Sequence, residues 1–139
     1  MPTPSYHQIS EANHRLMNPF STEKMLLLGE ICGLHPGQRL LDIACGKGEM
    51  LCQWSSRFGI KATGVDSQHP FLHDARQRAD ELNVSDRLSF VQSEAAEYVK
   101  QSADTFDLVS CIGATFVGGG FSGSLEMMKP ARKDSASLL

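Results

Sequence analysis

The sequence lacks three features that would indicate nucleic-acid binding, membrane insertion or export. It has no basic excess, with a net charge of −3, whereas a nucleic-acid groove needs basic residues concentrated on one face. No stretch approaches the roughly 18 apolar residues of a membrane span, and the first residues lack the charged start and apolar core of a signal peptide. We therefore expect a cytoplasmic protein with no nucleic-acid partner and no membrane partner.

Metal-binding spacings are also missing. The four cysteines lie in or beside apolar runs and show no paired zinc spacing: Cys32, Cys45, Cys52 and Cys111. Such cysteines are expected to be buried free thiols in a reducing compartment. His69 and His73 are four residues apart, but no glutamate follows His69 and no third ligand is evident. We expect surface histidines and no metal.

The chain does contain a glycine loop between a strand pattern and a helix pattern. An apolar run at residues 40–44 breaks at Gly46 and Gly48, and a helical pattern follows from Glu49. Glycine lets the backbone approach a ligand closely, and free amides at a helix start suit a small anionic group. Asp66 ends a second apolar run about twenty residues later, a spacing typical of an acid that binds ribose hydroxyls. The pattern predicts a nucleotide-type cofactor site.

Apolar spacing and turn residues predict helices alternating with strands. The strands are expected at residues 39–44, 61–65, 88–92 and 106–112. The helices are expected from 21 or 22 to 32, and at 49–58, 70–82, 95–101 and 122–129. On the first helix, the residues expected to face the core are Met25, Leu28, Ile31 and Cys32. This alternation predicts parallel strands joined by right-handed crossovers in the order 3-2-1-4, with the ligand beyond their carboxyl ends.

Three parts of the sequence together resemble the class I S-adenosylmethionine-dependent methyltransferases. They are residues 42–48, which are similar to the family's first motif, Asp66, and the Ser93-Glu94-Ala95 step after the third strand. Residues 18–24, which lead into the first helix, resemble those of a small-molecule group within the family. The resemblance implies an α/β fold, a Rossmann-like three-layer sandwich with a mostly parallel sheet. Residues 20–139 would form the cofactor-binding domain and residues 1–19 an arm or lid.

The resemblance also implies S-adenosyl-L-methionine as the cofactor and a set of residues that bind it. The glycine loop would hold the methionine end, with Asp42 orienting the loop and the cofactor's amino group, Asp66 would bind the ribose, and Glu94 the adenine amine. The set comprises Asp42, Ala44, Cys45, Gly46, Gly48, Asp66, Ser67, Gln68, Ser93, Glu94, Ala95 and Cys111. Four of these have simpler alternatives: Asp42 could only bond loop amides, Asp66 could be a common strand-end residue, Glu94 could be a first-turn acid, and Cys111 a structural thiol.

The implied reaction is methyl transfer to a small molecule by in-line displacement, which depends mainly on positioning. Residues 110–116 lack the Asp/Asn-Pro-Pro-aromatic motif of amino-group methyltransferases of nucleic acids, which favours a small-molecule acceptor. Any of four residues in the arm could be a general base, and the sequence does not choose among them: Tyr6, His7, His14 and Arg15. The catalytic residue therefore stays open.

Two other classes remain open. A nicotinamide-nucleotide oxidoreductase shares the strand–glycine–helix–acid pattern, but Leu51 stands where its third glycine would be. The other alternative is a truncated methyltransferase-like chain without activity on its own. The seven-stranded family domain continues for three strands beyond the fourth, whereas residues 133–139 provide at most the opening of one. The fourth strand would then be an exposed edge, and we expect self-association through it.

Overall fold

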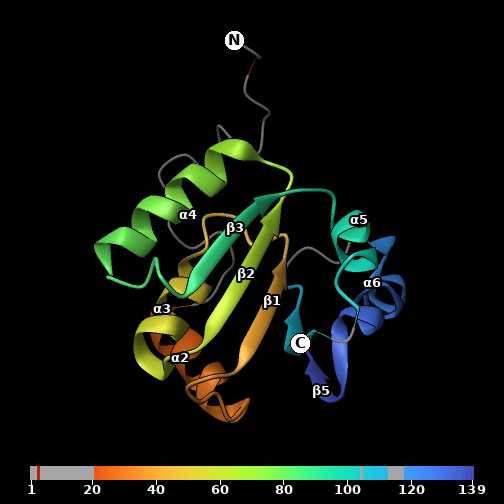
Figure 1. Ribbon diagram of the computed structural model, residues 1–139, viewed down its shortest axis with the longest axis horizontal. Helices are drawn as coiled ribbons and strands as arrows, with labels where there is room; N and C mark the ends of the chain where they lie inside the picture. Colours follow the sequence, from red (N-terminus) through yellow and green to blue (C-terminus); the bar gives the residue numbers. More distant parts are fainter. Residues whose placement is uncertain (1–2, 4–20, 104, 113–117) are drawn as a thin grey trace.

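A computed structural model of the chain describes residues 3, 21–103, 105–112 and 118–139. One five-stranded sheet with the order β3-β2-β1-β4-β5 forms its centre, and all its strand pairs are parallel (Figure 1). The strands are β1 (Arg39–Ile43), β2 (Lys61–Asp66), β3 (Leu88–Gln92), β4 (Phe106–Ser110) and β5 (Arg132–Leu138). The predicted order 3-2-1-4 is therefore confirmed, and β5 extends it.

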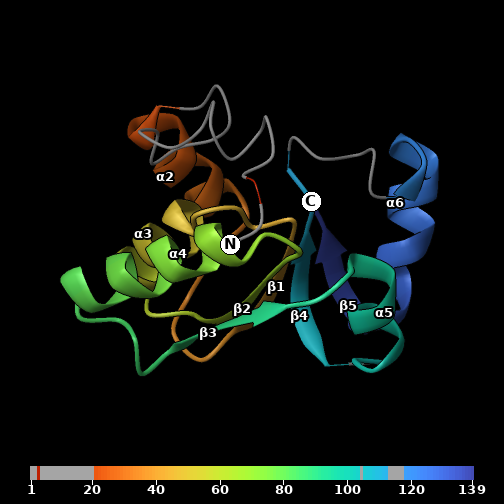
Figure 2. The ribbon, with the colours of Figure 1, turned by 90° about the horizontal axis from the view of Figure 1, so that it is seen from above.

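Helices cover both faces of the sheet, as the view from above shows (Figure 2). One face carries α2 (Thr22–Ile31), α3 (Glu49–Phe58) and α4 (His69–Glu81). The other carries α5 (Ala95–Lys100), α6 (Phe121–Met128) and the short 3-10 helix η2 (Lys129–Ala131). Because successive strand residues point to opposite faces, Leu40 joins the first core cluster whereas Leu41 and Ile43 join the second. The expected three-layer sandwich is confirmed.

The first helix buries a different face from the one expected. Met25 and Gly29 are buried, Leu28 and Cys32 are partly buried, and Ile31 is 74% exposed. A Cβ on Gly29 would lie 2.5 Å from the Phe58 ring, so α2 packs closely against α3 at that glycine. Ile31 is two residues further along the helix and is turned by roughly 200° from this contact. The prediction that Ile31 faces the core was therefore wrong.

The fourth strand is not a sheet edge. Leu108 and Val109 pair with Ser137 and Leu138 of β5, after an irregularity in register. The pairing continues past the strand, where Leu139 N donates to Val109 O at 2.8 Å. The expectation that nothing covers this edge was wrong. The position of β5 is set by its pairing with β4, and its own sequence has no apolar pattern that would predict a strand. Self-association through an exposed β4 loses its structural basis.

Two further expectations concern membranes and the arm. Among the described residues, no helix is long and apolar enough to cross a membrane. The arm at residues 1–19 lies outside the described residues, apart from residue 3, as do its four candidate bases.

Candidate functional site

The loop after β1 is held by an unusual run of backbone conformations. Ala44, Gly46 and Gly48 have φ values of 56°, 57° and 69°, in the left-handed region that glycine adopts readily and other residues rarely do. The loop is tied to the next strand by Cys45 N, which donates to Val65 O at 3.0 Å. The two glycines therefore allow the sharp turn that leads from the end of β1 into the start of α3.

Asp66 faces this loop, as its spacing from Gly46 predicts. Its Oδ2 accepts a hydrogen bond from Gly46 N and its Oδ1 accepts one from Gln68 N, each at 2.9 Å. Its backbone oxygen also accepts from Ser93 N at 3.2 Å, which brings the end of β3 alongside. Each carboxylate oxygen has a second lone pair. The half-buried Asp66 carboxylate can therefore accept further hydrogen bonds while it holds the loop.

The ring of Phe90 on β3 packs closely against the glycine loop. A Cβ on Gly48 would lie 2.7 Å from the Phe90 ring and 2.9 Å from Ala75 Cβ, and a Cβ on Gly64 would lie 2.8 Å from Cys45 Sγ and 2.9 Å from Phe90. The absence of side chains at both glycines is what lets the loop close onto β3. Sequence reasoning did not identify Phe90 or Gly64, although a glycine inside a strand is itself a sign of close approach.

A buried carboxyl group lies under the same loop. Asp42 is 5% exposed, and its Oδ1 accepts a hydrogen bond from Ser110 Oγ at 2.7 Å. Burial raises the pKa of Asp42 to about 7, with the Ser110 hydrogen bond lowering it and the charge of Asp66 raising it. Among the described residues no loop amide donates to Asp42. The structure therefore does not show the alternative in which Asp42 only bonds loop amides. Ser110 was not among the predicted site residues.

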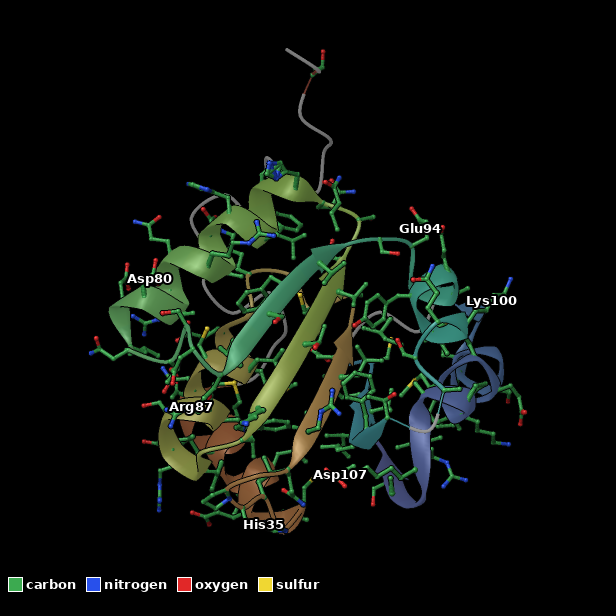
Figure 3. The ribbon with its side chains drawn as sticks, viewed as in Figure 1. His35, Asp80, Arg87, Glu94, Lys100 and Asp107 are labelled. Carbon is green, nitrogen blue, oxygen red and sulfur yellow. The ribbon has the colours of Figure 1, made fainter. Side chains whose placement is uncertain are left out.

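The other predicted residues lie at the same end of the sheet. Glu94 is exposed and precedes α5 without making a side-chain cap, and Figure 3 shows it at the end toward which the strands point, far from Asp107 at the opposite end. Ser67 O accepts from Gln92 Nε2 at 3.3 Å, and Ala95 begins α5. The structure therefore joins the loop, Asp66 and Ser93 directly. Glu94 follows Ser93, whose Oγ donates to the Glu94 backbone oxygen at 3.0 Å.

Neither cysteine of the site is an ionised thiol near neutral pH. Burial raises the pKa of Cys111 to about 11, and the charge of Asp42 raises it further. Burial also raises the pKa of Cys45 well above its usual value, as do the charges of Asp42 and Asp66. A protonated thiol is a weak nucleophile. The alternative that Cys111 is a structural thiol is therefore consistent with its burial.

One buried cation belongs to the loop and was missed at the sequence level. Lys47 is only 8% exposed, and its Nζ lies 3.8 Å from Oδ2 of Asp74 on α4. The sequence alone does not show that this loop lysine is buried, because its burial depends on how α4 packs. In contrast, His69 and His73 are both exposed, and the described residues contain no cluster of three potential metal ligands.

Comparison with known proteins identifies the family. Residues 40–122, more than half of the chain, match the family described as "Methyltransferase domain". The chain belongs to this methyltransferase family. The matched region contains the glycine loop, Asp66 and the Ser93-Glu94-Ala95 step. The family assignment therefore favours a methyltransferase over the nicotinamide-nucleotide alternative.

Individual relatives agree with this assignment. The Escherichia coli K12 protein YjhP is 41% identical over 100% of this chain, which covers 55% of YjhP. A SAM-dependent methyltransferase from Thiobacillus denitrificans, solved in complex with S-adenosyl-L-homocysteine, is 36% identical with a TM-score of 0.90; the match covers 98% of this chain and 54% of that one. The erythromycin 3''-O-methyltransferase of Saccharopolyspora erythraea is 30% identical over 88% of this chain and 39% of its own length. The chain thus spans between 39% and 55% of the length of these relatives.

Proposed function

We propose that this chain binds S-adenosyl-L-methionine at the loop of residues 44–48 and provides the cofactor half of a methyltransferase. The observation that carries the proposal is the pair of hydrogen bonds from Gly46 N and Gln68 N to Asp66. They hold an acid at the end of β2 against a glycine loop at the end of β1, where doubly wound folds bind nucleotide cofactors. The Thiobacillus relative, which was crystallised with the demethylated cofactor, supports the choice of ligand.

The roles of the individual residues follow from this arrangement. The loop would hold the methionine end of the cofactor, with Asp42 beside its amino group. Asp66 would accept from the ribose hydroxyls and Glu94 from the adenine amine. The residues that complete the cofactor contacts in this proposal are Ala44, Cys45, Gly46, Gly48, Ser67, Gln68, Ser93, Ala95 and Cys111.

Ligand-dependent thermal stability tests the choice of cofactor. A ligand that binds only the folded state raises its unfolding temperature. We expect S-adenosyl-L-homocysteine to raise the unfolding temperature of the chain and NAD to leave it unchanged. Leu51 is fully buried in the core, in the position where a dinucleotide fold has the glycine that permits close helix–strand packing. Stabilisation by NAD alone would contradict the proposal.

We further propose that the methyl acceptor is a small molecule. Two observations support this: the end of β4 lacks the Asp/Asn-Pro-Pro-aromatic motif, and the erythromycin methyltransferase is among the relatives. Incubation with methyl-labelled cofactor and a size-fractionated cell extract should place the label in the low-molecular-weight fraction. Label in RNA or protein would contradict a small-molecule acceptor. Cofactor binding without any labelling would instead support the alternative of a chain without activity on its own.

A further inference from the structure

Two buried polar side chains meet where β1 and β4 end. Asp42 and Ser110 are register partners across these strands, and Ser110 Oγ lies 2.7 Å from Asp42 Oδ1. The other oxygen, Asp42 Oδ2, accepts no hydrogen bond from the described residues. A buried carboxylate with only one hydrogen bond is poorly compensated for the loss of its hydration. This carboxylate lies beside the loop at which the cofactor's amino group is proposed to bind.

The hydroxyl of Ser110 favours the ionised form of this carboxyl group. A serine hydroxyl has one proton to donate, and Leu41 O, its other acceptor, is further away at 3.4 Å. The Ser110 hydroxyl therefore donates its hydrogen bond to Asp42. A hydrogen bond to the charged form lowers the pKa of a carboxyl group. Burial acts in the opposite direction and prevails, which leaves the pKa of Asp42 at about 7.

Three other ionisable groups interact electrostatically with Asp42. They are Asp66 at the end of β2, Cys45 in the loop and Cys111 just after β4. The thiols have raised pKa values and stay protonated near neutrality. Asp66 is the carboxylate whose charge acts on Asp42 and raises its pKa.

We propose that Ser110 is a positioning residue for the cofactor: its hydroxyl orients Asp42 and favours its ionised form, so that the remaining carboxylate oxygen takes the cofactor's ammonium group. The inference rests on the proposed function and adds to it a dependence on pH. The ammonium group favours the ionised carboxylate, so binding near pH 6 releases the Asp42 proton to solvent. Affinity then rises with pH by about tenfold between pH 6 and pH 8 and levels off above.

Calorimetric titration of S-adenosyl-L-homocysteine at pH 6, 7 and 8 tests this proposal. In Ser110→Ala we expect the affinity at pH 7 to fall several-fold and the rise with pH to move to higher pH, because the donor that favours ionisation is gone. Ser110→Thr keeps a hydroxyl and should restore the wild-type profile. Ser55→Ala is the matched control, since Ser55 is equally buried and donates to Ile60 O at 2.9 Å. Its profile should coincide with that of the wild type.

Two measurements need no variant. The ligand 5'-methylthioadenosine lacks the amino-acid end of the cofactor, so its affinity should not change between pH 6 and pH 8. Carbon-13 NMR of the Asp42 carboxyl in the free wild-type chain should show a midpoint near pH 7, and it should move to lower pH when S-adenosyl-L-homocysteine is bound.

The outcomes distinguish this inference from the function on which it rests. A pH-independent affinity for S-adenosyl-L-homocysteine, or equal pH profiles for wild type and a folded Ser110→Ala chain, would overturn the role of Ser110 and leave the cofactor site intact. Absence of binding at every pH would overturn the proposed function and this inference with it.

Discussion

At the scale of single residues, Asp66 is the side chain on which the proposed site depends most. It accepts two backbone hydrogen bonds in the structure and is proposed to accept ribose hydroxyls as well. Hydrogen bonds to a charged group contribute roughly 1.5–3 kcal/mol each. We therefore expect Asp66→Ala to weaken binding of S-adenosyl-L-homocysteine by about tenfold or more in a calorimetric titration.

The control for this variant is Asp80→Ala. Asp80 is an exposed carboxylate on α4, and Figure 3 shows it away from the end of the sheet where Glu94 lies. Its replacement should leave the affinity unchanged. A loss below twofold in Asp66→Ala would show that the carboxylate does not bind the cofactor.

Gly48 makes a second prediction at this scale. Gly48 and Gly33 have nearly the same φ, 69° and 66°, but an added Cβ would meet Phe90 and Ala75 at Gly48 and nothing within 4 Å at Gly33. Both alanine variants therefore share the backbone strain, and only Gly48→Ala adds overpacking, which typically costs about 1–3 kcal/mol. Urea denaturation should show a free energy of unfolding lower by that amount in Gly48→Ala than in Gly33→Ala. Equal losses would mean that the loop is not closed onto Phe90.

At the scale of elements, an ion pair joins the helix after the loop to the next helix. Glu49, the first residue of α3, accepts from Arg78 Nε at 2.9 Å and Nη2 at 3.2 Å, and from Gln53 Nε2 at 2.9 Å. Glu49 is 7% exposed and Arg78 22% exposed, so Glu49→Gln leaves a partly buried guanidinium facing a neutral side chain with a single acceptor oxygen. We expect Glu49→Gln to lower the free energy of unfolding by about 1–3 kcal/mol, measured by urea denaturation.

Glu81 provides the comparison for this ion pair. It is 42% exposed and bonds the same arginine, at Nη1, and exposed pairs contribute about 0–1 kcal/mol. Glu81→Gln should therefore change stability by less than Glu49→Gln. The opposite ranking would show that α3 and α4 are not joined through Glu49.

Asp107, which accepts hydrogen bonds from both β1 and β5, gives a prediction that depends on pH. Asp107 on β4 accepts from Arg39 N at 2.8 Å and from Lys133 Nζ at 3.0 Å. Mainly through the Arg39 hydrogen bond, and also through Lys133, these partners hold the pKa of Asp107 below its usual 3.8. Because the unfolded state binds this proton more readily, the stabilisation is present above about pH 4 and is lost as the pH falls through the folded-state pKa.

Urea denaturation of wild type and Asp107→Asn at pH 7 and pH 3 measures this effect. We expect Asp107→Asn to be less stable than wild type at pH 7 and the difference to shrink at pH 3. Asp86→Asn is the control, because Asp86 is exposed and its side chain makes no hydrogen bond among the described residues. A difference for Asp107→Asn that is the same at both pH values would contradict the lowered pKa of Asp107.

At the scale of the whole molecule, the sequence predicted those features whose signals are local. The order of β1 to β4, the helix that begins at Glu49 and the contact between Asp66 and the loop follow from glycine positions, apolar periods and one spacing. The role of β5 did not, because its residues 133–137 are mostly polar and its position is set by pairing with β4. Ser110 and Phe90 were missed for a related reason. Each contacts its register partner on the neighbouring strand: Ser110 contacts Asp42, and Phe90 contacts Gly64. The register between strands cannot be read from a single sequence.

The central claim is that the whole fold serves to place a cofactor at the loop of residues 44–48. Calorimetric titration of S-adenosyl-L-homocysteine into the wild-type chain and into Gly46→Val tests it most directly. Gly37→Val is the control, because Gly37 also has positive φ, at 89°, and open space around it. Binding by the wild type and by Gly37→Val, and its loss in a folded Gly46→Val chain, is the predicted result. Undiminished affinity in folded Gly46→Val would contradict the account.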